Sequence, residues 1–244
     1  MNMPRRIEPE WLDELPPDDP RAVRSRRDLR RINMLMRNSA IVAREVSRAW
    51  RSRSICSIAE IGAGDGMFML KLARNTAAQL PRARVVLLDR QSIVDTATLA
   101  ELGTLGWQAQ PASADVFEWL AQPAAPVFDV LIANLFLHHF DEARLKALLA
   151  LVAQRTYRFI ACEPRRSTFA LVASHLLGVI GCNDVTRHDA VVSVHAGFER
   201  RELSALWPSG RGWNLHEGAR RLFSHCFVAS SPRYADERAA ADEL

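Results

Sequence analysis

Three glycines within five positions, in the stretch AEIGAGDGMFML (residues 59–70), are the feature of the sequence best suited to binding a ligand. Glycine adopts left-handed backbone conformations at little cost, so such a loop lets a ligand approach the backbone closely. The spacing departs from the dinucleotide fingerprint G-x-G-x-x-G, because Met67 stands where that pattern has its third glycine. Glu60 and Asp65 add negative charge, which opposes a pyrophosphate and attracts a cationic ligand. The loop therefore predicts a cationic, amino-acid-bearing nucleotide.

Two acidic residues end later apolar runs. Asp89 closes ARVVLLD, and its carboxylate can accept hydrogen bonds from both hydroxyls of a ribose. Dinucleotide enzymes use the same contact, so Asp89 alone does not separate the two kinds of cofactor. Asp115 follows the next run, where it can contact a nucleotide or cap the helix that starts after it.

The order of Glu60, one spacer residue, and then alternating glycines resembles the first motif of the class I S-adenosylmethionine-dependent methyltransferases. The resemblance covers about residues 54–164 and implies a small-molecule enzyme with S-adenosylmethionine as its cofactor. It implies a ribose contact at Asp89, adenine contacts after the third strand, and a methionine or acceptor contact after the fourth. The implied cofactor-binding residues are Glu60, Gly62, Gly64, Gly66, Asp89, Arg90, Asp115, Val116 and Asn134. Arg90 is equally well explained as an exposed side chain.

Histidines supply the candidate general bases. His138 and His139 follow the fourth strand in LHHF, and an imidazole near neutral pKa can take a phenolic or carboxylic proton. A histidine at a helix start can instead pack and cap. His188 and His195 lie in TRHDAVVSVHAGF, where they face either the acceptor or the surface of a helix.

The sequence lacks the residues that nucleic-acid methylation or a metal-dependent methyl transfer would need. The segment NLFL departs from the N/D/S-P-P-aromatic tetrad of amino-directed nucleic-acid methyltransferases, and no Pro-Cys pair offers a nucleophile for cytosine C5. A catechol-type Mg²⁺ site needs several carboxylates after the fourth and fifth strands, and Glu163 alone offers itself there. We therefore expect no metal.

Apolar strands alternate with helical patterns through the middle of the chain, which is typical of parallel strands buried on both faces. The expected strands are 54–61, 83–89, 107–115, 127–134 and 157–164, and the expected helices are 67–80, 93–103, 116–122 and 141–155. Two more strands within 212–230, joined around 218–221, end the sheet antiparallel. The predicted fold class is α/β: a doubly wound, mostly parallel seven-stranded sheet with an antiparallel last strand.

Helical patterns precede and follow these alternating units. Residues 1–20 predict an extended, proline-rich leader, and residues 24–50 predict one broken or two consecutive amphipathic helices. We expect residues 1–53 to form this leader and an N-terminal helical cap, and residues 54–244 to form the methyltransferase domain. Residues 165–212 are expected to be a helical lid insertion over the acceptor, and its apolar run FALVASHLLGVIG favours a hydrophobic acceptor.

Composition limits the partners and the compartment. The chain has 244 residues, 25% of them charged, and a net charge of +4. Its basic excess is almost entirely arginine without interleaved aromatics, so we expect no nucleic-acid partner. No apolar run approaches the ~18 residues of a membrane span. Four scattered cysteines without a C-x-x-C pair indicate a reducing cytoplasm. A homodimer is left open.

The residues favour one function and leave two others open. We expect an S-adenosylmethionine-dependent methyltransferase that O-methylates a small hydrophobic acceptor, such as a phenolic or polyketide-like metabolite. One alternative is an NAD(P)-dependent oxidoreductase. The other is a non-catalytic accessory protein of the same fold that binds the cofactor. It stays open because the cofactor motifs can be intact in a protein that has no catalytic base.

Overall fold

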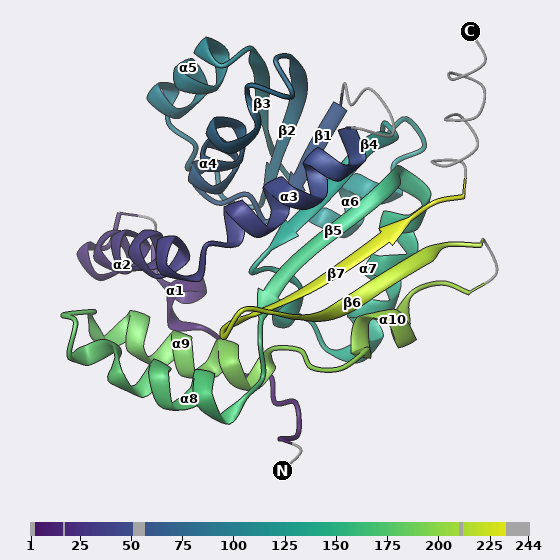
Figure 1. The fold of residues 1–244 in the computed structure, drawn as a ribbon. Helices are drawn as coiled ribbons and strands as arrows, with labels where there is room; N and C mark the ends of the chain where they lie inside the picture. Colours follow the sequence, from purple (N-terminus) through teal and green to yellow (C-terminus); the bar gives the residue numbers. More distant parts are fainter. Residues whose placement is uncertain (1–2, 17, 51–56, 210–211, 233–244) are drawn as a thin grey trace, which may run out of the picture.

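A seven-stranded sheet forms the centre of the protein (Figure 1). The computed structural model describes residues 3–16, 18–50, 57–209 and 212–232. The strands lie in the order β3-β2-β1-β4-β5-β7-β6, and β7 runs antiparallel to both of its neighbours. The strands are β1 (Ser57–Ile61), β2 (Ala83–Asp89), β3 (Trp107–Ser113), β4 (Phe128–Asn134), β5 (Thr156–Pro164), β6 (Asn214–Arg220) and β7 (Ser224–Ser230). This arrangement confirms the predicted fold class.

The burial of the strands explains their apolar sequences. All seven residues of β4 are buried, and so are the last four of β1, because helices cover both faces of the sheet there. β3 is an edge strand, paired with β2 only, and it tolerates Pro111 because no second neighbour needs that residue's missing N–H. The parallel strands end along one edge of the sheet, where Asp89 and Asn134 are the last residues of β2 and β4.

Two layers of helices cover the sheet (Figure 1). One apolar cluster joins the sheet to α3, α4 and α5, and a second joins its other face to α6, α7 and α10. Carboxylates cap α5, α6 and α7, where Asp95, Asp115 and Asp141 accept backbone N–H hydrogen bonds. The helices are α1 (Trp11–Glu14), α2 (Pro20–Met36), α3 (Asn38–Trp50), α4 (Met67–Thr76), α5 (Thr96–Thr104), α6 (Val116–Ala121), η1 (Leu137–His139), α7 (Glu142–Arg155), α8 (Thr168–His175), η2 (Leu176–Gly178), α9 (Asp184–Ala196) and α10 (Glu202–Leu206).

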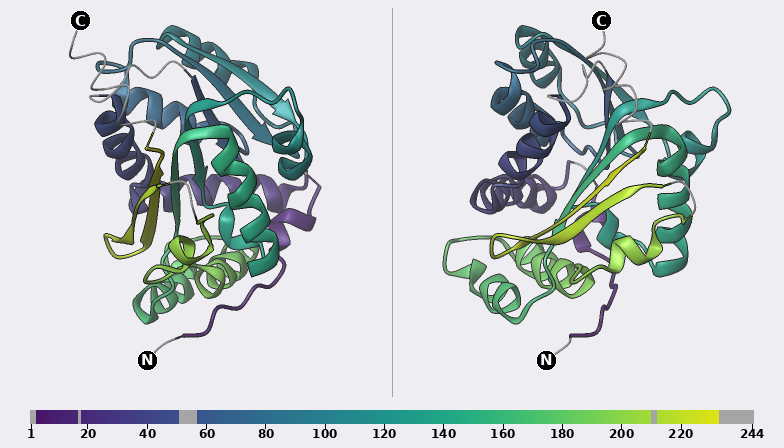
Figure 2. Two further views of the ribbon diagram at one scale, coloured as in Figure 1. Left: turned by 90° about the vertical axis from the view of Figure 1, so that its right-hand side faces the viewer. Right: turned by 45° about the vertical axis from the view of Figure 1, so that its right-hand side comes forward.

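The remaining helices gather at the edge where the parallel strands end. There α9 packs against α1, α2 and α8, and both views of Figure 2 show α8 and α9 side by side. The N-terminal segment crosses the same edge, because Arg5 Nε donates to the carbonyl of Ala196 over 2.8 Å and its Nη2 to that of Phe140 over 2.9 Å. The N-terminal segment and the helices α8 and α9 therefore surround the ends of the strands.

The structure corrects two details of the expected elements and confirms a third. The leader is not extended throughout, since it contains the one-turn helix α1. The helical region after it consists of two consecutive helices, which is one of the two predicted forms, and they break at Arg37, whose φ is +57°. The last hairpin turns at residues 221–223 rather than 218–221, because β6 continues through Arg220. Residues 54–56 of the first expected strand, and with them the 53/54 boundary, lie outside the described residues.

Cysteines and hydropathy add two observations. Cys162, Cys182 and Cys226 are free, buried thiols, whereas Cys56 lies outside the described residues. Within the described ranges no helix is both long and apolar enough to cross a membrane. The cytoplasmic location and the absence of a nucleic-acid partner stay predictions, and a homodimer stays open.

Candidate active site

A cavity of about 1060 Å³ opens at the edge where the parallel strands end. Its walls are the loops after β1, β2, β3 and β4 on one side and residues of α1, α2, α8 and α9 on the other. Pockets for a single small ligand measure about 300–1,000 Å³. The cavity therefore has room for a nucleotide-sized cofactor and a second molecule beside it.

The glycine loop forms one wall of this cavity. Gly62, Gly64 and Gly66 all have positive φ, between +54° and +73°, a conformation that other residues rarely adopt. The N–H groups of Gly62 and Ala63 donate to the carbonyl of Leu88 over 2.9 and 3.1 Å, which ties the loop to the end of β2. A Cβ at Gly64 would have no atom within 4 Å, so the backbone there faces open space.

Asp89 lies at the rim of the cavity and is already held by the backbone. Its Oδ2 accepts the N–H of Gly64 over 2.8 Å and its Oδ1 that of Gln91 over 2.9 Å. An ionised carboxylate has about four acceptor positions, so both oxygens can still accept hydroxyl groups. The two backbone bonds fix the carboxylate beside the glycine loop.

The residues after β3 line the same wall. Asp115 caps α6 by accepting the N–H groups of Phe117 and Glu118, as the alternative interpretation of this residue predicted, and it also borders the cavity. Val116 is buried, whereas Arg90 is exposed, and both line the cavity. A contact of these residues with adenine stays a prediction.

Glu60 is a buried carboxylate that lacks a full set of partners. Its side chain is 1% exposed, and Oε2 has no hydrogen-bond partner among the described residues. Burial raises the pKa of Glu60 well above its usual range, and the carboxylates of Asp65 and Asp89 raise it further. Asp65 is itself paired with Arg30 of α2 over 2.7 Å, whereas no such ion pair holds Glu60 among the described residues.

Asn134 ends β4 inside a buried hydrogen-bonded chain. Asn38 Nδ2 donates to Asn134 Oδ1 over 3.0 Å, and Ser224 Oγ donates to Asn38 Oδ1 over 2.7 Å. The next residue, Leu135, has a φ of +53°, a strained conformation for leucine that clusters at functional sites. This chain connects α3 and β7 to the cavity wall.

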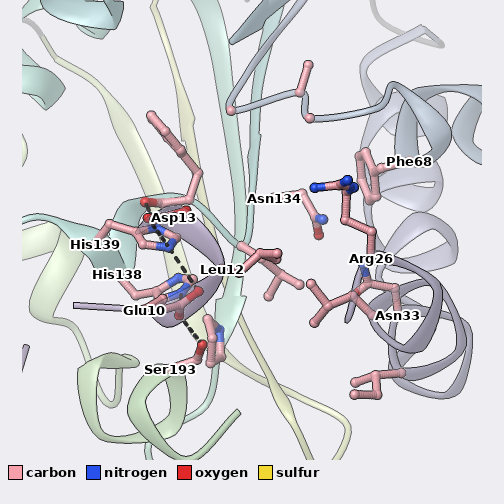
Figure 3. Close-up of a pocket in the computed structure, with 18 of the residues that line it drawn as sticks. Glu10, Leu12, Asp13, Arg26, Asn33, Phe68, Asn134, His138, His139 and Ser193 are labelled. Atoms are coloured by element: carbon pink, nitrogen blue, oxygen red, sulfur yellow. Dashed lines mark hydrogen bonds and ion pairs between the residues drawn. The ribbon is translucent and has the colours of Figure 1, made fainter. Parts of the chain in front are cut away.

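His138 and His139 face a carboxylate that comes from the N-terminal segment (Figure 3). The Nε2 atom of His138 lies 3.3 Å from Glu10 Oε1, and that of His139 lies 3.4 Å from Glu10 Oε2. On the other side of each ring, His138 Nδ1 lies 2.8 Å from Glu163 Oε2 and His139 Nδ1 lies 2.9 Å from the carbonyl of Phe136. Both histidines and Glu10 line the cavity.

The charges of this cluster reinforce one another. Burial alone would raise the pKa of Glu10, but hydrogen bonds from His138 and His139 hold it well below its usual range. Burial likewise lowers the pKa of His139, and Glu10 outweighs that effect and raises it to about 9. The cluster therefore favours a protonated, positively charged His139 beside an ionised Glu10 carboxylate.

No pattern in the sequence pointed to Glu10 or to the residue that supports it. Ser193 of α9 donates its hydroxyl hydrogen bond to Glu10 Oε1. Glu10 lies in the segment expected to be an extended leader, about 130 residues before the histidines, and no spacing connects the two. Asp189 follows His188 in the sequence, but its partners in α1 could not be predicted from that position.

His188 and His195 are not among the described residues that line the cavity. His188 stacks on Trp11 with ring centroids 3.8 Å apart, and its Nδ1 lies 2.9 Å from Asp189 Oδ1. The Asp189 carboxylate accepts the N–H groups of Trp11 and Leu12 over 2.9 and 3.0 Å. His188 and Asp189 thus hold α1 in place, and neither His188 nor His195 lines the cavity, so we leave both histidines out of the proposed chemistry.

Removing this clamp is expected to loosen the N-terminal segment. Asp189→Ala loses two hydrogen bonds to a charged acceptor, each worth about 1.5–3 kcal/mol, so the amides of Trp11 and Leu12 should exchange at least about tenfold faster. Hydrogen exchange followed by mass spectrometry measures this. Asp184→Ala, at an exposed site of the same helix, is the matched control. Equal protection in both variants would contradict the clamp.

Comparisons with known proteins identify the fold. Neither a scan of protein-family models nor a search of curated proteins finds a match. Among solved structures, the plantazolicin methyltransferase BpumL in complex with SAH is 12% identical, with 88% of this chain and 91% of that chain covered and a TM-score of 0.61. A putative O-methyltransferase from Nostoc punctiforme is 17% identical over 93% of this chain and 64% of that one, with a TM-score of 0.59. Magnesium protoporphyrin IX methyltransferase (ChlM) from Synechocystis with bound SAM is 14% identical over 85% and 83%, with a TM-score of 0.53. The chain has the class I methyltransferase fold, as the resemblance in its sequence predicted.

Proposed function

We propose that the protein is an S-adenosylmethionine-dependent methyltransferase that O-methylates a small hydrophobic acceptor. The observation that carries this proposal is Glu60, a buried carboxylate whose Oε2 lacks a partner at the base of a glycine loop that is open at Gly64. The cofactor has an ammonium and a sulfonium, and its positive charge suits the unpaired carboxylate. A nicotinamide dinucleotide would instead bring its pyrophosphate to this acidic loop.

The cofactor fits the residues at the ends of four strands. Asp89 would accept the ribose hydroxyls, and Asp115 with Val116 would border the adenine. Asn134 would lie near the methionine part, where the chain from Asn38 fixes its amide. The solved structures with SAH or SAM support this assignment through their shared fold.

The bound cofactor supplies an electrophilic methyl group. The work of this chain is to position the acceptor oxygen in line with that methyl group, which accounts for much of the acceleration in such reactions. The cluster of Glu10, His138 and His139 borders the same cavity and would hold the acceptor hydroxyl and take its proton. Glu163 and Ser193 orient the cluster by their hydrogen bonds to His138 and Glu10.

The apolar wall of the cavity supports a hydrophobic acceptor, and the expected segment supplies only part of that wall. In the segment FALVASHLLGVIG the large side chains of Phe169 and Val179 are 55% and 84% exposed, so the predicted lid turns much of its apolar surface outward. The apolar residues that line the cavity include Ala170, Ala173 and Leu177 of this segment, together with residues of α2: Leu29, Ile32, Leu35 and Met36. A flat phenolic or polyketide-like acceptor suits such a wall.

Cofactor binding tests the proposal. S-adenosylmethionine should raise the thermal midpoint and NAD(P)H should not. Asp89→Ala should weaken S-adenosylmethionine at least about tenfold by calorimetry, because it removes hydrogen bonds to a charged acceptor worth about 1.5–3 kcal/mol each. Glu101→Ala, on an exposed face of α5, is the control and should leave the affinity unchanged.

Two outcomes would contradict the proposal. Stabilisation by NAD(P)H alone would favour an oxidoreductase. Tight binding of S-adenosylmethionine without transfer of labelled methyl to any phenol, carboxylic acid or amine in a broad screen would favour the accessory protein.

A further inference from the structure

We propose that Glu10, His138 and His139 bind one divalent transition-metal ion at the acceptor side of the cavity. This goes beyond the proposed methyl transfer, because the ion site depends on side chains that the cofactor assignment does not use. It also departs from the expectation of no metal, which considered only carboxylates at the ends of the strands.

The three side chains converge on one point. One ligand atom from each of them lies within 4.8 Å of the others, and each imidazole Nε2 lies 3.3 or 3.4 Å from a Glu10 oxygen. Zinc binds His nitrogen and carboxylate oxygen at about 2.0–2.2 Å, which places neighbouring ligand atoms about 3.0–3.5 Å apart. The observed spacing therefore suits a shared ion. Figure 3 shows the Glu10 carboxylate between the two rings and Ser193.

The hydrogen bonds of the two rings indicate which nitrogen is free. The Nδ1 atoms face Glu163 Oε2 and the carbonyl of Phe136, which are both acceptors, so each Nδ1 carries the hydrogen. In a neutral ring this leaves a lone pair on Nε2, pointing at the Glu10 carboxylate. Without an ion, a proton on each Nε2 supplies the contacts to Glu10; when an ion binds, these protons leave and both lone pairs bind the ion beside the carboxylate. Metal-binding histidines show the same pattern, with the outer N–H donated to a carboxylate or a backbone carbonyl.

The surroundings hold these ligands in place. Glu163 is fully buried, and its Oε1 accepts the N–H groups of Phe136 and Leu137, so its other oxygen is committed to His138. Ser193 donates to Glu10, and Asp13 Oδ2 lies 3.8 Å from His139 Nε2 as a further oxygen. The ligand set thus has a preformed supporting shell.

Two imidazoles and one carboxylate select the kind of ion. Mg²⁺ and Ca²⁺ prefer oxygen ligands throughout, whereas this set suits Zn²⁺, Co²⁺, Mn²⁺ or Fe²⁺. Since all three residues line the cavity, a coordination position remains on the cavity side. If the proposed function is right, an acceptor oxygen would occupy that position, and the ion would promote loss of its proton in place of direct transfer to the histidines.

The test is metal binding to the untagged full chain, measured without S-adenosylmethionine. After treatment with a chelator and gel filtration, Zn²⁺ titrated by calorimetry should bind one ion per chain, and Co²⁺ should give visible bands of a nitrogen- and oxygen-ligated site. Glu10→Gln and His139→Asn should each weaken Zn²⁺ at least about tenfold. The matched controls Glu8→Gln and His216→Asn, both at exposed sites, should bind Zn²⁺ as the wild type does.

Cofactor affinity separates this site from the proposed function. Glu10→Gln should lose Zn²⁺ and keep its affinity for S-adenosylmethionine, which also shows that it is folded, while Asp89→Ala should do the reverse. The absence of a stoichiometric Zn²⁺ site in the wild type would overturn the metal proposal. Unchanged Zn²⁺ affinity in Glu10→Gln and His139→Asn would overturn it as well. So would ¹⁵N resonances of two imidazolium rings at pH 8 in the presence of Zn²⁺, because protons would then supply the cation.

Discussion

Gly62→Ala is expected to destabilise the protein by at least about 2–3 kcal/mol and to abolish cofactor binding. Two costs add at this position. Gly62 has a φ of +71°, a conformation that costs a residue with a Cβ about 1–2 kcal/mol. Its Cβ would also lie 2.3 Å from Phe136 Cδ2 and 3.0 Å from Phe136 Cβ, so that ring must move. Phe136 packs edge-to-face on Phe140 beside the histidines, and overpacking of this kind typically costs another 1–3 kcal/mol.

Gly64→Ala is the matched control. Its φ is +54°, so the backbone cost is similar, but a Cβ there has no atom within 4 Å. This variant should lose only about 1–2 kcal/mol of stability, while its methyl group enters the space assigned to the cofactor and weakens binding. Urea denaturation and calorimetry on the two variants measure both quantities. Equal losses of stability in Gly62→Ala and Gly64→Ala would show that the contact with Phe136 adds nothing to the cost of a Cβ at Gly62.

The sheet and the cofactor wall follow from local patterns in the sequence. Apolar strands such as VFDVLIAN specify burial on both faces, and Asp89 and Asn134 could be placed because each ends such a strand. The spacing of the glycines likewise predicts a turn with positive φ angles. These features depend on residues that are close in the chain, which is why the sequence alone could predict them.

The acceptor side depends on contacts between distant segments. Glu10 reaches His138 across 128 residues, and Ser193 reaches Glu10 across 183, with no periodicity to connect them. His188 and His195 do not line the cavity. The sequence could not predict this, because a helix pattern does not say which face of the helix meets the site. The outward direction of Phe169 and Val179 also depends on packing that periodicity cannot supply.

Glu60→Gln is expected to be more stable than the wild type at pH values above the raised pKa of Glu60, and to bind S-adenosylmethionine more weakly. The pKa of Glu60 is raised by burial first, and then by Asp65 and Asp89. Between the ordinary pKa of 4.5 and this raised value, the folded protein holds a proton that the unfolded chain has released. The free energy of unfolding therefore falls as pH rises through this window. Glutamine removes that dependence, so the variant should exceed the wild type in stability once the pH passes the raised pKa.

Ligand affinity should respond in the opposite direction. The proposed cofactor pairs with ionised Glu60, so wild-type affinity should rise with pH across the same window, and the affinity of Glu60→Gln should stay flat. At the alkaline end the variant should bind at least about tenfold more weakly, since a hydrogen bond to a charged group is worth about 1.5–3 kcal/mol. Denaturation and calorimetry over a pH series measure both effects, with Glu118→Gln on the exposed side of α6 as the control. A variant less stable than the wild type at every pH would mean that Glu60 serves the fold, and parallel affinity profiles would remove it from the cofactor site.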